Sequence, residues 1–175
     1  RLLGAKFLPP DRPSNIVNRS RLIDRVQNTR ARIITIIGPA GSGKTALSAA
    51  CYRAERLSGH HVCWLHVDDS DNGPSFWLHL CTAVALEHTS QDFSWLEHPH
   101  ENSPLPWINA LINQLAKLEG ETTLFIDDYH CICSKDIHRD LKQLLAYLPA
   151  NMKLVMSSRA DIPIPLARLR MSGQL

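Results

Sequence analysis

Hydrophobic positions along the chain alternate between a strand-like and a helix-like pattern. Short apolar runs that end at turn-forming or polar residues indicate buried strands, and the first of them is apolar on both faces, as in a central parallel strand. Between the runs, apolar residues recur every three or four positions, the spacing of a helix with one buried face. The alternation predicts an α/β domain with a mostly parallel sheet and right-handed crossovers. The expected strands cover 32–37, 61–67, 122–126 and 152–156.

Residues typical of helix ends bound the helical segments. The segment 45–57 places its apolar residues on one stripe, of which Leu57 is the last. Residues 88–103 are polar and predict a surface insertion with three solvated histidines, His88, His98 and His100. We expect helices over 19–28 and 45–57, and three more that run from Pro74, from Pro106 to Gly120, and from Ser134 to Pro149.

A single domain accommodates the whole sequence. The chain has 175 residues, enough to bury one core, and apolar residues make up 44% of it. Residues 1–18 are Pro-rich and irregular, which predicts an extended arm laid on a core formed by residues 19–175. The chain does not begin with Met and shows no signal peptide, so we expect a fragment of a longer protein.

Charge and hydropathy argue against two classes of partner. Lys and Arg total 19 and Asp and Glu total 17, a balance that argues against nucleic-acid binding by this chain itself. No apolar run approaches the roughly 18–20 residues of a membrane span. We therefore expect a protein that acts neither on DNA directly nor at a membrane.

Cysteine usage indicates buried thiols rather than disulfides or zinc ligands. The five cysteines lack the density of a disulfide scaffold, so reduced thiols in a cytoplasmic protein are expected. Cys51, Cys63 and Cys81 fall on faces predicted to be buried. The spacing of a structural zinc site is not matched by the group His130, Cys131, Cys133 and His138.

The most specific motif is a glycine-rich segment between the first strand and the following helix. Residues 38–45 match the pattern G-x-x-x-x-G-K-[ST]. Glycines let the backbone curl so that successive N–H groups point at phosphate oxygens, and the helix N-terminus favours an anion. Lys44 can reach the β- and γ-phosphates, and the Thr45 hydroxyl can ligate Mg²⁺. The predicted nucleotide-binding residues of this phosphate loop are Gly38, Pro39, Ala40, Gly41, Ser42, Gly43, Lys44 and Thr45.

An acidic pair after the third strand predicts the metal side of the site. Asp127 directly follows the apolar run, so its carboxylate would hold Mg²⁺ from the side opposite Thr45. Asp128 is then placed to orient or deprotonate an attacking water. Arg159, in the segment Ser-Ser-Arg after the fourth strand, can bond phosphate oxygens in bidentate fashion. The predicted catalytic residues are therefore Lys44, Asp127, Asp128 and Arg159.

Several segments resemble, in order along nearly the whole chain, the nucleotide-binding domain of the STAND ATPases. The similarity is to the large LuxR-type transcriptional activators of the maltose-regulon type. Many ATPases share the phosphate loop and the acidic pair, whereas the sequences of segments 127–130 and 166–170 are typical of far fewer families. The matching segments are 6–10, 16–19, 38–45, 64–72, 125–130, 157–159 and 165–170. The expected fold is a three-layer α/β P-loop NTPase of the ASCE type, truncated after its fourth core strand.

The resemblance implies a regulatory ATPase. Val17 would lie against the adenine, Arg19 near the phosphates, and Arg159 would sense the γ-phosphate. Members of the family hold ADP at rest, exchange it for ATP when an inducer binds, self-associate and activate transcription, and slow hydrolysis returns them to rest. They bind DNA through a C-terminal helix-turn-helix domain and the inducer through sensor domains, which we expect to lie outside this fragment. The expected cofactors are ATP or ADP with Mg²⁺.

Other functions stay open on the sequence alone. A small-molecule P-loop kinase has a similar length, but it needs an acceptor pocket and usually an Arg-rich lid, and no clear lid segment is visible. A GTPase would carry an Asn-Lys-x-Asp signal, which the sequence lacks. A module that holds nucleotide without turnover would carry the same motifs. Two interpretations are open for the arginines near the N-terminus: they lie on a solvated helix face, or they contact phosphates or a neighbouring subunit. These arginines are Arg19, Arg21, Arg25, Arg30 and Arg32.

Overall fold

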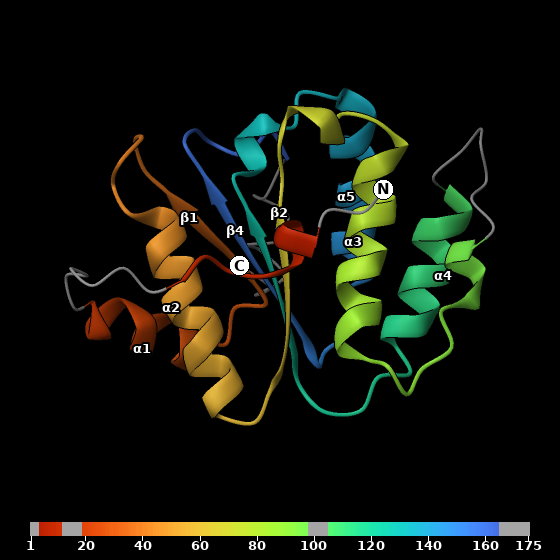
Figure 1. Cartoon of the computed structure of the whole chain (residues 1–175), viewed down its shortest axis with the longest axis horizontal. Coiled ribbons are helices and arrows are strands. Elements are labelled where there is room, and N and C mark those ends of the chain that lie inside the picture. Colours follow the sequence, from red (N-terminus) through yellow and green to blue (C-terminus); the bar gives the residue numbers. More distant parts are fainter. Residues whose placement is uncertain (1–3, 12–18, 98–104, 165–175) are drawn as a thin grey trace.

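The computed structural model describes residues 4–11, 19–97 and 105–164. A parallel sheet lies at its centre, with helices on both sides (Figure 1). This confirms the predicted three-layer α/β architecture. On one side lie α1 (Ser20–Asn28) and α2 (Lys44–Leu57), and on the other lie α3 (Pro74–Glu87), α4 (Leu105–Leu115) and α5 (Lys135–Ala146).

The sheet has the strand order β1-β4-β3-β2, and every described pair of neighbours is parallel. The strands are β1 (Ile33–Ile37), β2 (His61–His66), β3 (Thr122–Asp127) and β4 (Met152–Ser158). Because β4 lies between β1 and β3, the strand before the phosphate loop and the strand that ends in Asp127 are not neighbours. The carboxyl ends of parallel strands meet at one edge of the sheet, so both motifs face the same edge.

The first strand does not occupy a central position in the described part of the chain. Within the described residues β1 pairs with β4 alone, and Ile37 at its end is exposed. The apolar pattern of 32–37 reports what covers the two faces of the strand, not what pairs with its edges. The prediction that this run forms a central strand is therefore wrong for the described sheet.

Alternate residues of the strands build two separate cores. Trp64 on β2 and Phe125 on β3 face α2, where their rings pack edge-on against Tyr52 with centroids 5.9 and 5.8 Å away. Leu65 and Ile126, one position further along, belong to the core beneath α3 and α5. Full burial of a large apolar side chain stabilises the fold by about 1.5–3 kcal/mol. Such side chains on both faces of β2, β3 and β4 hold these strands in place, and with them the residues at their ends.

Two helix ends and the exposure of one side chain differ from the prediction. Leu57 is 90% exposed, because the buried stripe of α2 runs through Tyr52 and Glu55, and Leu57 lies about 200° around the helix from Glu55. α4 ends at Leu115, well before Gly120. α5 ends at Ala146, before Pro149, although Ser134 caps it as predicted, accepting the backbone N–H of Ile137.

His88 is buried rather than solvated. It follows the last residue of α3, its Nε2 lies 3.2 Å from the hydroxyl of Thr122, and its ring lies 4.5 Å from that of His61. The chain therefore folds beneath the amino ends of β2 and β3 here instead of leaving the core. His98 and His100 lie outside the described residues. Cys51, Cys63 and Cys81 are buried free thiols, as predicted.

None of the helices in the described part of the chain has the length and apolar character needed to span a bilayer.

Candidate nucleotide-binding site

The phosphate loop joins β1 to α2 and has the backbone shape that its glycines predict. Gly41 has φ 73° and Gly43 has φ 80°, both in the left-handed region that residues with a Cβ avoid. Gly43 precedes the first residue of α2, and its carbonyl accepts the N–H of Leu47. The loop therefore ends at a helix N-terminus, whose free N–H groups and dipole favour an anion.

Two cations lie on this loop. Lys44 is buried, and its Nζ donates a 2.9 Å hydrogen bond to the carbonyl of Pro39, so the side chain folds back across the loop. Arg19 donates a 2.9 Å hydrogen bond to the carbonyl of Ser42. The resemblance expects Arg19 near the phosphates, and the structure brings it to the loop that would hold them. Val17 lies outside the described residues.

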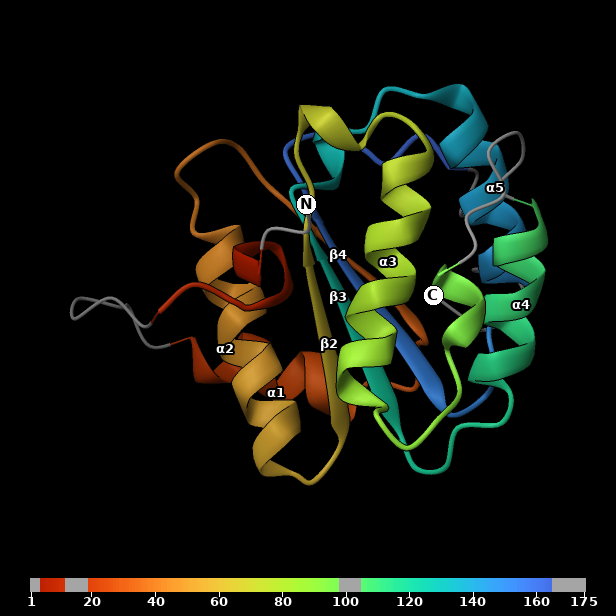
Figure 2. The ribbon, with the colours of Figure 1, turned by 45° about the vertical axis from the view of Figure 1, so that its right-hand side comes forward.

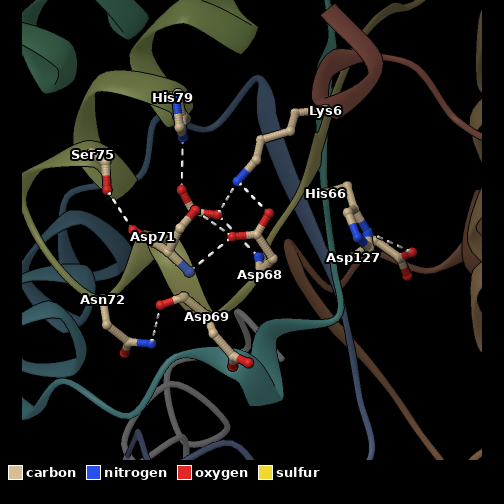
Figure 3. A network of polar contacts seen from close by, with 10 residues as sticks. Lys6, His66, Asp68, Asp69, Asp71, Asn72, Ser75, His79 and Asp127 are labelled. Carbon is tan, nitrogen blue, oxygen red and sulfur yellow. Dashed lines mark hydrogen bonds and ion pairs between the residues drawn. The ribbon is translucent and has the colours of Figure 1, made fainter. Parts of the chain in front are cut away.

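Thr45 and Asp127 meet across the sheet edge. The hydroxyl of Thr45 lies 3.2 Å from Oδ1 of Asp127, and Ser157 donates a second hydrogen bond to the same oxygen. Oδ2 of Asp127 is buried without a hydrogen-bond partner among the described residues, and Nδ1 of His66 lies 3.6 Å from it (Figure 3). A carboxylate with one unsatisfied buried oxygen beside a hydroxyl is a donor set that suits Mg²⁺, which prefers oxygen ligands.

The surroundings of Asp127 keep it ionised. Burial alone would raise the pKa of its carboxyl, but His66 and the hydroxyls of Ser157 and Thr45 lower the pKa, and the net shift is downward. The same contact with Asp127 raises the pKa of His66. The Asp127 carboxyl is therefore ionised at neutral pH, the form in which an aspartate binds a metal cation.

Asp128 has a left-handed backbone, with φ 60° and ψ 37°. This conformation is uncommon for residues other than glycine, although Asp tolerates it better than most. It turns the chain sharply after β3, and the N–H of Asp128 donates to the hydroxyl of Ser157 at 3.0 Å. Asp128 thereby lines the same cavity as the phosphate loop.

A cavity of about 360 Å³ is lined by the phosphate loop, Thr45 and Asp128. This volume is typical of a small-molecule site. Arg159, which follows β4, also lines it. The remaining lining comes from α2 and from the N-terminal segment, a contribution that the sequence did not predict. The lining residues are Pro10, Asp11, Ala40, Gly41, Gly43, Lys44, Thr45, Ala46, Ala49, Arg53, Asp128 and Arg159.

Two polar residues next to Asp127 were not singled out from the sequence. His66 ends β2, and its place opposite Asp127 follows from the pairing of β2 with β3, which puts the two residues in register. Ser157 belongs to the Ser-Ser-Arg segment at the end of the fourth predicted strand. Its position in the segment before Arg159 was a usable signal, since that segment reaches the same edge of the sheet.

Comparisons with known proteins agree with this geometry. The family described as "AAA domain" matches residues 26–164. The HTH-type transcriptional regulator MalT of Yersinia enterocolitica is 33% identical over 99% of this chain, and MalT of Vibrio cholerae is 31% identical over 96%. The chain spans 19% of the length of each of these relatives.

Two solved structures have a similar fold. Cdc6p of Pyrobaculum aerophilum has a TM-score of 0.61 and 15% identity, and the match covers 91% of this chain and 44% of that one. Drosophila ORC bound to DNA has a TM-score of 0.55 and 16% identity, with 90% of this chain and 42% of that chain covered. At these identities the likeness shows the fold alone.

Proposed function

Because this chain belongs to the AAA domain family of P-loop ATPases and is related to the MalT regulators, we propose that it binds ATP and ADP with Mg²⁺ and acts as a nucleotide switch. The observation that carries the proposal is the 3.2 Å separation of the Thr45 hydroxyl and the Asp127 carboxylate, which are 82 positions apart in sequence. Such a pair beside a phosphate loop suits a metal-bound triphosphate.

The phosphate chain would be held by the backbone N–H groups of residues 38–45 and by Lys44. Lys44 would exchange its hydrogen bond to the carbonyl of Pro39 for phosphate oxygens, which are stronger partners because they are charged. Thr45 and Asp127 would hold Mg²⁺, which when bound neutralises charge on the phosphates. Arg19 would add a further cation beside the loop.

The γ-phosphate would distinguish the two states. Arg159 and Asp128 line the cavity together, so an arginine for the terminal phosphate and a carboxylate for the attacking water are both in reach of one ligand. ATP engages both groups and ADP does not, so the two nucleotides stabilise different conformations. Slow hydrolysis through Asp128 would reset the switch.

The relatives indicate which process the proposed switch would control. They are HTH-type transcriptional regulators, so we expect this domain to report a signal to transcription. DNA recognition and inducer binding would then belong to regions of those proteins that this chain does not span, and self-association in the ATP state would transmit the switch. Residues 1–175 would act as one nucleotide-binding domain in the cytoplasm. The kinase alternative gains no support from these relatives.

Isothermal titration with ADP and with a non-hydrolysable ATP analogue tests the proposal. We expect the wild type to bind both, Mg²⁺ to strengthen binding of the analogue, and Lys44→Ala to weaken it by at least about tenfold. Lys142→Ala is the matched control, because Lys142 is an exposed lysine on α5. Folded wild-type protein that binds neither nucleotide at about 1 mM would refute the proposal.

A further inference from the structure

A buried lysine near the N-terminus has no part in the phosphate site. Lys6 lies in the short helix η1 (Gly4–Phe7), and it is 6% exposed. Its Nζ lies 2.6 Å from Oδ2 of Asp71 and 2.8 Å from Oδ2 of Asp68 (Figure 3). Lysine is rarely buried unless it is paired, so this pair of contacts fixes the position of the segment that carries it.

Asp71 is the centre of the cluster. It is 1% exposed, and besides Lys6 it accepts the N–H of Asp68 at 3.0 Å and contacts Nδ1 of His79 at 2.7 Å. Lys6 also lowers the pKa of Asp68 to about 2, so that carboxylate stays ionised at neutral pH. We call Lys6, Asp68, Asp71 and His79 the latch.

The latch fastens the N-terminal segment to the turn after β2. Asp68 caps η2 (Asp69–Asp71), which precedes α3, and His79 lies on α3 itself. Phe7 is buried and packs edge-on against His79 with ring centroids 6.0 Å apart. η1 packs against β2: it lies in front of that strand, between α2 and α3, in Figure 1 and beside the strand in Figure 2.

The turn that anchors the latch is itself tied to the acidic side of the site. The side-chain amide of Asn72, next to Asp71, donates to the carbonyl of Cys131 at 2.8 Å and accepts the N–H of Cys133 at 2.6 Å. These residues belong to the segment that leads from Asp128 to α5. Hydrogen bonds of Asn72 therefore join the anchor of the latch to that segment.

Four residues beyond Lys6, the same N-terminal segment reaches the cavity. The carbonyl of Pro10 accepts a 2.5 Å hydrogen bond from Arg53, and Pro10 and Asp11 line the cavity. Arg53 lies on α2 about 13 Å along the helix axis from Lys44. Pro10 and Asp11 therefore form a wall of the same cavity as the phosphate loop but belong to a separately held segment, and a ligand with its phosphates on the loop could place its nucleoside against them.

We propose that the latch positions Pro10 and Asp11 as the wall against which the nucleoside part of the nucleotide packs. Lys6 is thus a positioning residue, which acts on the ligand through the segment it holds and not by contact. The inference rests on the proposed nucleotide site. It adds to the phosphate loop a second part of the site, the wall for the nucleoside, which the latch holds in place. It predicts that loss of the latch affects the nucleoside and spares the phosphates.

Two probes separate these halves. A non-hydrolysable ATP analogue engages both the wall and the loop, whereas inorganic tripolyphosphate engages the loop alone. With Mg²⁺ present, we expect Lys6→Met to weaken binding of the analogue by roughly tenfold and to change tripolyphosphate binding by less than about twofold. Lys142→Met, the same substitution at an exposed lysine of α5, should leave both affinities unchanged.

The second variant is Asp68→Asn, for use if Lys6→Met does not fold. The Asp68 side chain is partly exposed, and an amide can still accept the N–H of Ser70, but it places an N–H donor against Lys6. We expect the same selective effect, smaller in size. A general loss of stability would weaken binding of the ATP analogue and of tripolyphosphate alike, so weaker binding of the analogue alone points to the wall.

Three results would overturn the inference. In the folded variants, wild-type affinity for the analogue would show that the wall needs no latch, and equal weakening of both probes would show an effect on the loop. Failure of both variants to fold would make the latch a folding element instead. A wild type that binds neither probe would refute the proposed nucleotide site itself, which is a different and recognisable outcome.

Discussion

The hydroxyl of Ser157 donates a hydrogen bond to the carboxylate of Asp127, on the neighbouring strand and 30 positions away in sequence. The same hydroxyl oxygen accepts the backbone N–H of Asp128 at 3.0 Å. Both side chains are fully buried. One serine thus orients the carboxylate on the metal side and fixes the start of the turn that carries the second acid.

Replacing Ser157 with alanine should therefore cost both stability and metal-dependent binding. The change leaves the N–H of Asp128 unpaired and removes a donor from a buried carboxylate, so we expect the free energy of unfolding to fall by about 1–3 kcal/mol. Chemical denaturation measures this loss, and titration with the Mg²⁺-bound ATP analogue should show weaker binding. Ser90→Ala, at an exposed serine, should change stability by less than about 0.5 kcal/mol. Unchanged stability of Ser157→Ala would contradict the described geometry.

Substitutions at Asp128 should separate backbone strain from chemistry. At φ 60° a glycine avoids the roughly 1–2 kcal/mol that a Cβ costs, so Asp128→Gly should be more stable than Asp128→Ala by about that amount. Asp128→Asn tolerates the left-handed backbone and removes only the charge, so it should fold normally and release phosphate from ATP at least about tenfold more slowly. Phosphate release by the wild type no faster than by this variant and by Lys44→Ala would instead favour a module that holds nucleotide without turnover.

His88 should make the fold sensitive to mild acid. Burial, reinforced by the neighbouring His61, lowers the pKa of His88 below its ordinary value of 6.5. The unfolded chain therefore binds a proton first, so the contribution of His88 to stability is complete above pH about 6.5 and decreases as the pH falls from there toward the folded pKa. Denaturation between pH about 7.5 and 5 should show a shallower decline for His88→Gln than for the wild type. Equal slopes would exclude His88 as the cause.

The cysteines should differ sharply in reactivity. Burial raises the pKa of Cys51 to about 12 and also raises the pKa values of Cys63 and Cys81, so these thiols carry almost no thiolate in the folded protein. Cys133 is exposed. With an alkylating reagent at pH about 8, mass spectrometry should find Cys133 modified first and the three buried thiols modified only after unfolding. Early labelling of Cys51 would indicate that α2 opens locally.

Features encoded within a few consecutive residues were predictable. The turn of residues 38–45 follows from their glycines, and a polar residue directly after an apolar run predicts the position of Asp127 at the end of β3. The pairing of Ser157 with Asp127 depends on the placement of β4 beside β3, which no local pattern specifies. Lys6 and Asp71 are 65 positions apart, and a lysine in a Pro-rich arm gives no sign that it is buried.

The wrong predictions have a common physical origin. Polarity near His88 predicted a surface segment, yet the hydroxyl of Thr122 and the ring of His61 make a buried imidazole acceptable there. The apolar run of β1 predicted a central strand, although in the described sheet it lies at the edge. In both cases residue type reports the average environment, whereas partners brought in from distant segments decide the actual one.

The position of β4 between β1 and β3 also determines how tolerant this architecture is to change. Two interstrand spacings, about 10 Å in total, separate the strand before the phosphate loop from the strand that ends in Asp127, and backbone ladders on both edges of β4 maintain them. These ladders are formed by strand residues and not by the described surface loops. Lengthening or shortening those loops during evolution would therefore leave the spacing between β1 and β3 unchanged. Regulatory segments could be added there without moving Thr45 away from Asp127.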